Sequence, residues 1–354
     1  MPWSKATVAG LLLAAFTATS AAAPELKASL FHKDKYIMGT VFEIVVYHPS
    51  SDHAAQAMEE ALQEIVRLDG VMSNYKTDSE LSRLNRTAHF RAQVVSPDLY
   101  RVIEESLSFS RLSGGKFDVT VGPLVDRWKA ALRGEPVPPP AEEEKLRACV
   151  GFEKVELIPP NQIKFHSPCL QIDLGAIGKG YAVDRAVEIL RARDIKSALI
   201  DAGGSTFYGV GSPPGHAGWL VHLRDPSNKI DPQVMLCENS VSTSEQTPKS
   251  LLGNESAGHI IDPEKGAPLR TKYALSVVAK TGTVSDALST TLLLVGPEKG
   301  RGLVEGVGDA AAIWVSSEGQ TEIATSGPRI LTEGNSRSDV SVTGSAQKMC
   351  MAEK

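Results

Sequence analysis

The sequence predicts an α+β fold in which mixed, largely antiparallel sheets are flanked by helices. Short runs of alternating apolar and polar residues follow one another with only turn residues between them, which is typical of hairpins. Stretches with apolar residues every three to four positions lie among these runs and indicate amphipathic helices. A doubly wound parallel sheet would alternate strand and helix regularly, so the mixture favours the α+β class. The 354 residues, 42% of them hydrophobic, suffice for one large domain or two.

The first third of the chain is expected to be mainly helical after an opening strand. Residues 36–47 alternate like a strand that is interrupted near its start by the turn sequence M-G-T. A helix is expected over 52–73, where Asp52 can cap its start, and a short helix begins at 78–80. Serine followed by proline is a favourable helix start, so another helix is expected over 96–112, closed by two glycines.

The middle of the chain is expected to combine a short helix, a hairpin and a glycine-rich segment. A helical piece around Trp128 is followed by an exposed connection over 133–141, which carries four prolines. Residues 154–166 predict a hairpin turned by P-P-N. Residues 170–174 alternate like the end of a strand, and a helical pattern then runs over 181–193.

The second half of the chain is expected to consist of strands around one pair of helices. Thr283 can cap a helix that runs to 294 and is ended by Gly-Pro, and a second helix is expected over 298–304. The runs at 219–224, 234–238 and 241–244 resemble successive antiparallel strands. Further strands are expected over 197–202, 273–279, 310–315 and 321–324.

Both ends of the chain are expected to lie outside the folded domain, which we place at 35–326. Residues 1–23 combine a lysine, a short apolar run and small residues, which is typical of a cleavable signal peptide; a disordered start is the alternative. Residues 24–34 are expected to be an exposed lead-in, and the polar residues 327–354 a disordered tail. No later segment is apolar for long enough to cross a membrane, so we expect an exported, periplasmic protein that is soluble after cleavage.

Charge and cysteine spacing exclude several classes of function. The net charge of −5 and a pI near 6.0 give no basic surface of the kind that binds nucleic acid. The four cysteines show neither C-x-x-C nor metal-ligand spacing. We expect Cys149, Cys169 and Cys237 to be isolated buried thiols, although export would permit a disulfide, while Cys350 in the polar tail can be free.

The segment I-D-L-G-A-I-G-K-G-Y-A-V-D at 172–184 places a glycine-rich turn with Lys179 between an expected strand and an expected helix. Backbone N–H groups in such a turn can approach a phosphate closely, and a helix N-terminus favours an anion. The spacing matches neither G-x-G-x-x-G nor G-x-x-x-x-G-K-[ST], so no standard nucleotide fingerprint is present. The alternative is a tight turn that needs glycine only for its backbone.

A few polar and aromatic residues are candidates for binding or chemistry. Asp286 and Thr290 lie one helical turn apart and share one helix face, which suits a hard cation such as Mg²⁺. The alternative for this pair is ordinary helix chemistry near an N-terminus. His259, in H-I-I-D-P, is on the pattern alone more often structural than catalytic. Met38 and Tyr75 can abut a ligand ring, but core packing is the default for both.

Six motifs stand in order along the chain: M-G-T, M-S-N-Y-K, G-G-K-F-D-V-T-V-G-P-L-V, I-D-L-G-A-I-G-K-G-Y-A-V-D, H-I-I-D-P-E-K-G-A-P and S-D-A-L-S-T. Over roughly 35–323, their identity and order closely resemble the ApbE-type flavin transferases, the FAD:protein FMN transferases. The fold that this resemblance implies is an ApbE-like α+β fold of two sub-lobes with FAD between them.

The resemblance also implies a Mg²⁺-dependent reaction on FAD. Such enzymes attach the FMN half of FAD through a phosphoester to a threonine of a target protein and release AMP. Typical targets are membrane subunits of Na⁺-pumping NADH:quinone reductase and Rnf-type complexes, whose acceptor threonines face the periplasm. Some relatives act as pyrophosphatases instead and hydrolyse FAD to FMN and AMP.

The motif positions imply roles for particular residues. Contacts with FAD are implied for Met38, Gly39, Tyr75, Lys116, Phe117, Asp118, Asp173, Lys179 and Ile261. The implied metal site consists of the Asp286 carboxylate, the Thr290 hydroxyl and the main-chain carbonyl of Ala176, an oxygen-only set. His259 and Asp286 are the candidate bases for the acceptor hydroxyl, and an unperturbed histidine titrates near neutral pH.

One position departs from the family pattern, which usually reads S-T-S-G before the histidine loop. Here Glu245 follows S-T-S, which leaves the shape of 245–257 and of the acceptor site open. A flavin-binding or flavin-delivery protein that does not turn FAD over is the alternative from another class. Such a binder has no need of a metal at the pyrophosphate, so the retained Asp286, Thr290 and Lys179 favour the enzyme.

Overall fold

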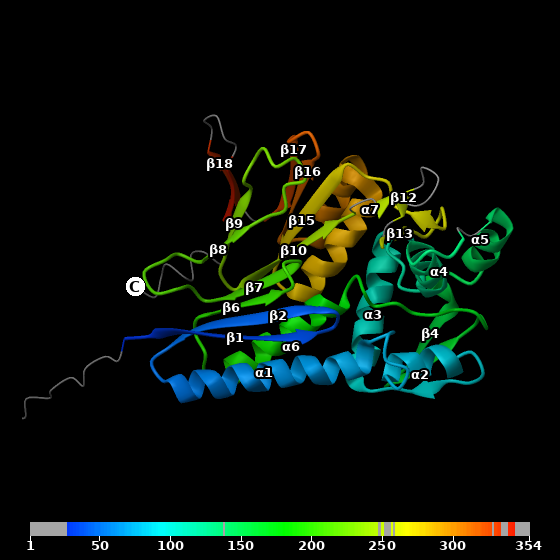
Figure 1. Cartoon of the computed structure of the whole chain (residues 1–354), viewed down its shortest axis with the longest axis horizontal. Helices are drawn as coiled ribbons and strands as arrows, with labels where there is room; N and C mark the ends of the chain where they lie inside the picture. Colours follow the sequence, from blue (N-terminus) through cyan, green and yellow to red (C-terminus); the bar gives the residue numbers. More distant parts are fainter. Residues whose placement is uncertain are drawn as a thin grey trace, which may run out of the picture.

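One large antiparallel sheet forms the centre of the molecule (Figure 1). The computed structural model describes residues 27–136, 139–246, 249–250, 256–257, 259–327, 329–333 and 339–343. Within these residues the strands of the sheet are, in spatial order, β1 (Ser29–Ile37), β2 (Thr40–His48), β6 (Ala198–Ala202), β7 (Thr206–Val210), β10 (Asn239–Glu245), β15 (Tyr273–Ala279), β16 (Ala310–Ser316) and β17 (Thr321–Ser326). Every neighbouring pair is antiparallel, and the predicted α+β class is confirmed.

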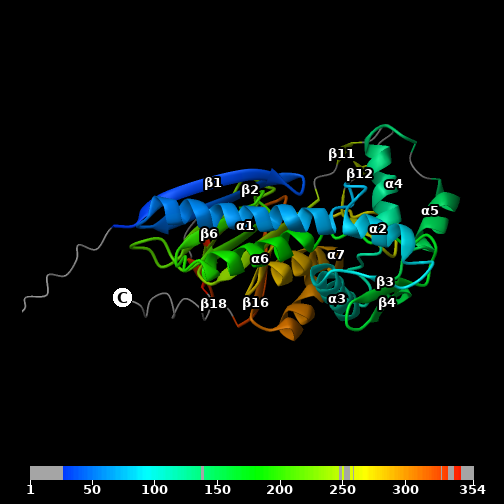
Figure 2. The same ribbon diagram turned by 90° about the horizontal axis from the view of Figure 1, so that it is seen from below.

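The large sheet is covered on both faces. Figure 2 shows one face under three helices, α1 (Ser51–Met72), α6 (Gly178–Ala192) and α7 (Gly282–Val307). The hairpin of β8 (Trp219–His222) and β9 (Gln233–Leu236) packs its apolar side chains on the other face, against β10, β15 and β16. Because it is buried on both faces, β16 reads A-A-A-I-W-V-S, almost wholly apolar, instead of alternating with polar residues.

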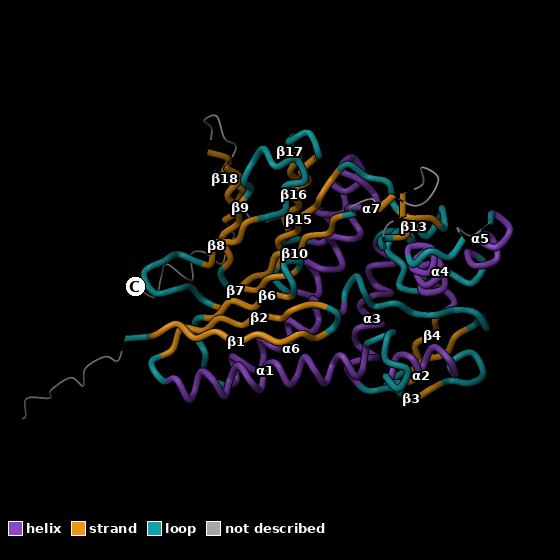
Figure 3. The backbone as a smooth tube through the Cα atoms, in the orientation of Figure 1, coloured by secondary structure: helices purple, strands orange, loops and turns teal. Residues whose placement is uncertain are grey.

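A small lobe lies beyond one end of the large sheet. It consists of α2 (Glu80–Thr87), α3 (Pro97–Leu112), α4 (Gly122–Leu132), α5 (Pro140–Arg147) and the sheet of β3 (Gln93–Val94), β5 (Gln162–Phe165) and β4 (Val155–Ile158). Figure 3 shows its helices α2, α4 and α5 set apart from the strands of the large sheet. The pair of β13 (Ile261–Asp262) and β14 (Ala267–Pro268) packs against α4. Further short elements are the 3₁₀ turn η1 (Phe152–Lys154), β11 (Lys249–Ser250) and β12 (Ser256–Ala257).

The N-termini of α6 and α7 meet at two glycines. A Cβ on Gly180 would collide with the carbonyl oxygen of Gly282 and would lie 2.7 Å from the Cβ of Asp286. Asp184, one turn further along α6, accepts the N–H of Gly282 at 2.6 Å and that of Thr283 at 2.8 Å. Glycine is therefore required at this contact, because side chains would separate the helix ends.

Several predicted elements are confirmed. α2, α3, β15 and the β4–β5 hairpin lie where the sequence places them. The backbone of α7 is non-helical at Gly296, with a φ of 77°, as the Gly-Pro signal predicts. Ser96 caps α3 by accepting the N–H of Leu99.

Two helix caps differ from the prediction. Ser50, not Asp52, caps α1 with its side-chain oxygen, and Asp52 lies inside the first turn. Thr281, not Thr283, caps α7 in the same way. Both capping residues have extended backbones, as a cap requires, so the first turn begins earlier than the apolar stripe suggests.

The glycine-rich segment also folds differently from the prediction. Residues 170–174 form no strand, and Gln171 makes an isolated bridge with Val121. α6 begins at Gly178 instead of 181, so Gly178 and Gly180 belong to its first turn. Local propensity disfavours glycine in a helix, but the close contact with α7 selects it at Gly180.

The strand boundaries reveal further differences. β1 begins at Ser29, inside the predicted lead-in of 24–34, because pairing along β2 as far as His48 orders it. β7 is missing from the prediction. β8 and β9 pair with each other as expected, but β10 pairs with β7 and β15 instead of continuing that hairpin.

The proline-rich connection and the tail are more ordered than predicted. α5 begins at Pro140, inside the expected connection of 133–141, since proline is well tolerated in a first helical turn. β18 (Arg329–Glu333) and β19 (Asp339–Thr343) form an antiparallel pair inside the expected tail, and β19 lies alongside β9. The polar composition masks the short alternation V-S-V in β19. The predicted signal peptide lies outside the described residues.

The prediction of isolated thiols is wrong. Cys149 and Cys169 form a disulfide with their Cα atoms 5.3 Å apart, and Cys237 is disulfide-bonded as well. Spacing along the sequence does not reveal such pairing, because the fold brings the two segments together. Cys350 lies outside the described residues.

Candidate active site

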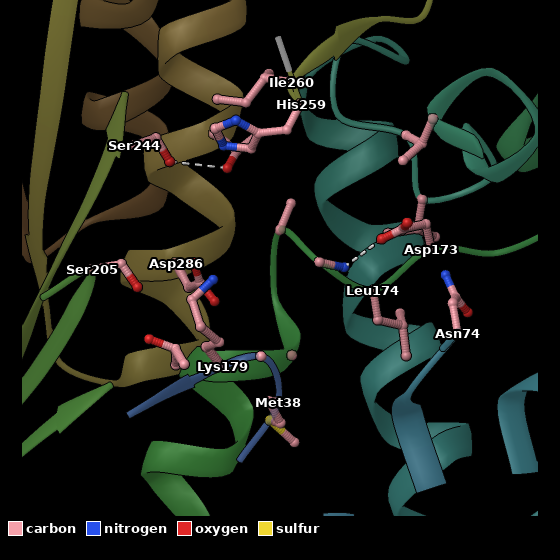
Figure 4. Close-up of a pocket in the computed structure, with 18 of the residues that line it drawn as sticks. Met38, Asn74, Asp173, Leu174, Lys179, Ser205, Ser244, His259, Ile260 and Asp286 are labelled. Atoms are coloured by element: carbon pink, nitrogen blue, oxygen red, sulfur yellow. Dashed lines mark hydrogen bonds between the residues drawn. The ribbon is translucent and has the colours of Figure 1, made fainter. Parts of the chain in front are cut away.

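A cleft of about 1180 Å³ lies between the large sheet and the small lobe, and every residue of the predicted site lines it. These residues are Met38, Gly39, Tyr75, Lys116, Phe117, Asp118, Asp173, Ala176, Lys179, His259, Ile261, Asp286 and Thr290. Figure 4 shows Lys179, Asp286 and His259 on one wall, facing Asp173 and Asn74 on the other. Segments far apart in the sequence therefore meet in one place.

The Asp286 carboxylate is buried in the first turns of α7. Its Oδ2 accepts the N–H of Gly180 at 2.9 Å. Burial raises the pKa of Asp286, against the opposing effects of the Lys179 charge and the Gly180 N–H. A buried carboxylate with a raised pKa is stabilised in its charged form by a cation that binds beside it.

The oxygen donors near Asp286 fit a hard cation. Thr290 lies one turn further along α7, and Ala176 precedes α6; both line the cleft. Among the residues that the structure describes, no group of three or more His, Cys, Asp or Glu side chains could hold a metal. A metal here would need one carboxylate, a hydroxyl, a carbonyl and ligand or water oxygens, a set that suits Mg²⁺ and not Zn²⁺.

Most amides of the glycine-rich segment are used inside the protein. The N–H groups of Gly175, Gly178 and Gly180 donate to protein acceptors at 2.7, 2.8 and 2.9 Å. In the described chain the amides of Ala176 and Lys179 have no such acceptor. The phosphate cradle expected from the sequence is thus reduced to these two amides and the Lys179 ammonium.

An exposed aromatic ring stands at the cleft. The Tyr75 side chain is 79% exposed, so core packing does not explain it. Its hydroxyl lies 2.5 Å from Nζ of Lys129, which also lies 4.9 Å from the ring centroid. Lys129 is in turn 3.7 Å from Oδ2 of Asp173. A ring held in this way can stack on a planar ligand.

The turn between β1 and β2 brings Met38 and Gly39 to the cleft. Both have positive φ values, 53° for Met38 and 77° for Gly39. This conformation is uncommon for a residue other than glycine, and it closes the tight turn of the hairpin. Figure 4 shows the Met38 side chain at the cleft.

The K-F-D segment lines the cleft and also holds its own loop together. Lys116 Nζ lies 2.5 Å from a carboxylate oxygen of Glu264, and Phe117 is buried. Asp118 accepts the N–H and the hydroxyl of Thr120 at 2.8 and 2.7 Å. Burial raises the pKa of Asp118, although these hydrogen bonds oppose the rise.

The histidine loop is anchored by a residue that the sequence analysis misses. His259 is exposed and lines the cleft. Beside it, Gln246 accepts the N–H of Ile260 at 3.0 Å and donates to the Ile260 carbonyl at 2.9 Å. Ile261 is buried in the apolar cluster that contains Trp128 of α4. A polar residue directly after β10 is the only sequence signal for Gln246.

Glu245, where the family usually has glycine, ends β10 in ordinary strand geometry. It pairs with Ala274 of β15, and its φ is not positive. Glycine is therefore not required for the backbone conformation here. Because Glu245 lines the cleft, the departure adds a carboxylate to the cleft wall.

Further cleft residues were not singled out by the sequence analysis. They include Asn74, Lys129, Ser205, Arg224 and Ser244. Within the described residues, the buried Oδ1 of Asn74 has no hydrogen-bond partner, as expected of an acceptor that awaits a ligand. Its place in M-S-N-Y-K was the available signal, whereas Ser205 and Arg224 are brought to the cleft only by the tertiary structure.

Sequence comparison relates the chain to flavin transferases. The ApbE family profile matches residues 38–314. The "FAD:protein FMN transferase" of Treponema pallidum (strain Nichols) is 32% identical over 294 residues, which cover 76% of this chain and 80% of that protein. The protein of the same name from Escherichia coli (strain K12) is 27% identical over 298 residues, 80% of this chain and 83% of that protein.

Structural comparison gives the same relationship. The "Flavin Transferase ApbE from Vibrio cholerae" superposes with a TM-score of 0.74 at 26% identity, covering 84% of this chain and 97% of that chain. The apo form of the Pseudomonas stutzeri flavinyl transferase ApbE superposes with a TM-score of 0.73 at 26% identity, covering 84% and 95%.

Proposed function

The chain belongs to the ApbE family, and on this premise we propose that it is an FAD:protein FMN transferase, which moves the FMN half of FAD to a threonine hydroxyl of a target protein and releases AMP. One observation carries this proposal: a single cleft gathers the residues of all six motifs. Its volume of about 1180 Å³ exceeds the usual range for small ligands, as a dinucleotide requires.

The two walls of the cleft would bind different parts of FAD. On one side, Tyr75 supplies an exposed ring for a planar group, and Lys129 holds that ring in place. On the other side, Lys179 supplies positive charge for the pyrophosphate, together with the amides of Ala176 and Lys179. The orphaned acceptor of Asn74 suits an N–H donor on one of the rings of FAD.

Asp286, Thr290 and the carbonyl of Ala176 would hold Mg²⁺ at the pyrophosphate. When bound, Mg²⁺ would neutralise the negative charge that develops during phosphoryl transfer. Asp286 must be ionised for this role. The Lys179 charge favours the ionised form, because it lowers the pKa of Asp286 against the effect of burial.

Transfer exchanges one phosphorus–oxygen bond for another. The threonine oxygen forms a bond to the phosphorus of the FMN half, the bond from that phosphorus to the bridging oxygen breaks, and AMP leaves with that oxygen. The hydroxyl proton passes to a base. We assign this role to His259, since Asp286 already accepts the Gly180 N–H through one of its oxygens.

The proposal also covers the acceptor protein and the cellular compartment. We expect acceptor threonines on exported or membrane-bound proteins, such as subunits of Na⁺-pumping NADH:quinone reductase or Rnf-type complexes. A periplasmic location is supported by the leader-like residues 1–23 and by the Cys149–Cys169 disulfide, since oxidising compartments preserve such bonds. In the described part of the chain, no helix is both long and apolar enough to cross a membrane.

The proposal is tested by incubating the purified protein with FAD, Mg²⁺ and a periplasmic and membrane extract. In-gel flavin fluorescence should then show a covalently labelled protein band that is absent with EDTA and with the Asp286→Ala variant. Release of FMN and AMP with no labelled band would instead identify a pyrophosphatase. No FAD breakdown at all would contradict an enzymatic role and leave a flavin-binding protein.

A further inference from the structure

A chain of hydroxyls joins Thr290 to the backbone of α7. Ser244, on β10, has its Oγ 3.0 Å from Oγ1 of Thr290 and 2.7 Å from Oγ of Ser289. Ser289 Oγ lies 2.9 Å from the carbonyl oxygen of Asp286. Figure 4 shows Ser244 on the cleft wall with a hydrogen bond drawn from its hydroxyl. The sheet and the helix are thus linked directly behind the predicted metal ligands.

Counting hydrogens fixes the direction of this chain. Three contacts are present, and the three hydroxyls supply one hydrogen each. The Asp286 carbonyl can only accept, so Ser289 must donate to it. Ser289 then has no hydrogen left for Ser244, and Ser244 must donate to Ser289. By the same argument Thr290 must donate to Ser244, because every other assignment leaves one contact without a hydrogen.

Because two of these hydroxyls are buried, a different assignment of their hydrogens would cost free energy. Ser289 is fully buried and Thr290 is only 9% exposed, so neither hydroxyl can exchange its partner freely for water. A buried polar contact that lacks its hydrogen costs about 1–3 kcal/mol. The direction with every contact satisfied is therefore favoured over its reverse, in which Thr290 would point its hydrogen into the cleft.

We propose that Ser244 and Ser289 are positioning residues that make Thr290 present only oxygen lone pairs to the cleft. In this state Thr290 can accept a hydrogen bond or coordinate a cation, but it cannot donate to a phosphate oxygen. The proposal rests on the proposed function, because it assigns to the hydroxyl chain the task of preparing Thr290 as a Mg²⁺ ligand.

The test measures Mn²⁺ binding, which is independent of turnover, by electron paramagnetic resonance of the free ion. Ser244→Ala and Ser289→Ala should each weaken Mn²⁺ binding by about tenfold, the effect of removing one well-placed hydrogen bond. Ser244→Thr keeps a hydroxyl and should restore binding to within threefold of the unmodified protein. Ser276→Ala is the matched control, since Ser276 is buried on β15 and its hydroxyl contacts Thr243 at 2.7 Å without belonging to the hydroxyl chain of Ser244, Ser289 and Thr290.

A double-mutant cycle decides whether the serines act through Thr290. Thr290→Val alone should weaken Mn²⁺ binding, and Ser244→Ala added to Thr290→Val should weaken it less than twofold further. Additive losses, or Mn²⁺ binding within twofold of normal in both serine variants while Asp286→Ala abolishes it, would overturn the hydroxyl chain but keep the metal site. If the unmodified protein binds no Mn²⁺ but still breaks down FAD, the metal assignment fails and this proposal with it. Failure to break down FAD with Mn²⁺ still bound would contradict only the proposed function.

Discussion

Asp286 combines two tasks in one carboxylate. It ties α7 to α6 through the Gly180 N–H, and it faces the cleft where the proposed pyrophosphate would lie. Sequence spacing predicted the pairing of Asp286 with Thr290 on one helix face, but it could not show that the carboxylate is buried. Because α7 begins at Gly282, Asp286 lies beyond the first turn, and burial of its carboxylate makes it a group whose charged form needs a cation.

Replacing the charge of Asp286 while keeping its shape should separate these two tasks. Asp286→Asn can still accept the Gly180 N–H, so we expect a melting temperature within a few degrees of the unmodified protein. AMP release from FAD should fall by at least about 10²-fold, as for loss of other preorganised electrostatic groups. AMP release near the normal rate, measured by chromatography, would contradict the proposed role of Asp286 as a metal ligand.

His259 should contribute as a general base. His259→Ala is expected to lower FMN transfer by about 10²-fold, the low end for such catalysis, with little change in FAD affinity. His166→Ala is the matched control, because His166 is exposed on the small lobe and pairs with Glu156 at 2.8 Å. If transfer at saturating acceptor falls less than threefold, His259 is only a loop residue.

Asp201 gives a pH-dependent signature of stability. Burial and the neighbouring Glu43 raise its pKa to about 6 in the folded protein, although the Gly204 N–H and Arg224 oppose the rise. A raised pKa means that the folded state binds the proton more tightly than the unfolded chain. The stability from Asp201 is therefore fully present below about pH 4 and is lost as the pH rises through about 6.

Asp201→Asn removes this loss, because its side chain stays neutral at every pH. The difference in free energy of unfolding between the variant and the unmodified protein should therefore favour the variant more at pH 7.5 than at pH 4.5. Urea unfolding at the two pH values measures it. An equal difference at both would show that Asp201 titrates normally.

The contact between α6 and α7 is the element on which the site depends. The sequence analysis singled out the glycines of 172–184 but predicted a turn for them. Glycine has a low helix propensity, and a local pattern carries no information about the neighbouring helix α7. By contrast α3 was predicted closely, since Ser96 and Pro97 carry the start signal within a few residues. Local sequence signals therefore predicted a helix whose start is marked by its own residues. They did not predict a helix start whose residues are selected by packing against another helix.

Gly180→Ala should test that contact. The new Cβ would collide with the Gly282 carbonyl, so the helix ends must separate, with an expected cost of about 1–3 kcal/mol. Metal binding and turnover should fall as well, because Asp286 moves with α7. Gly302→Ala is the matched control: Gly302 also lies in α7, and a Cβ there meets nothing within 4 Å.

Urea denaturation distinguishes the two glycine variants. Gly302→Ala should be neutral or stabilising by up to about 1 kcal/mol, the difference in helix propensity between the two residues. If Gly180→Ala is as stable and as active as Gly302→Ala, close packing of α6 on α7 is not required for the site.

The cleft lies where the large sheet with its helices meets the small lobe. The large sheet with its helices supplies Asp286 and Lys179, whereas the small lobe and the loops leading into it supply Lys116 and Asp173. Composition and periodicity gave the α+β class, and the ordered motifs gave the residues of the cleft. Neither could give the pairing of β10 with β7 and β15, the disulfide or the strand pair near the C-terminus, because each depends on contacts between distant segments.

The central claim concerns where the FMN half goes after FAD is cleaved. The most direct measurement compares, in one reaction with FAD, Mg²⁺ and the acceptor extract, the amount of AMP released with the amount of flavin bound covalently to protein. We predict equal amounts, with both lost in Asp286→Asn. AMP accompanied by an equal amount of free FMN, and by no protein-bound flavin, would contradict the transferase.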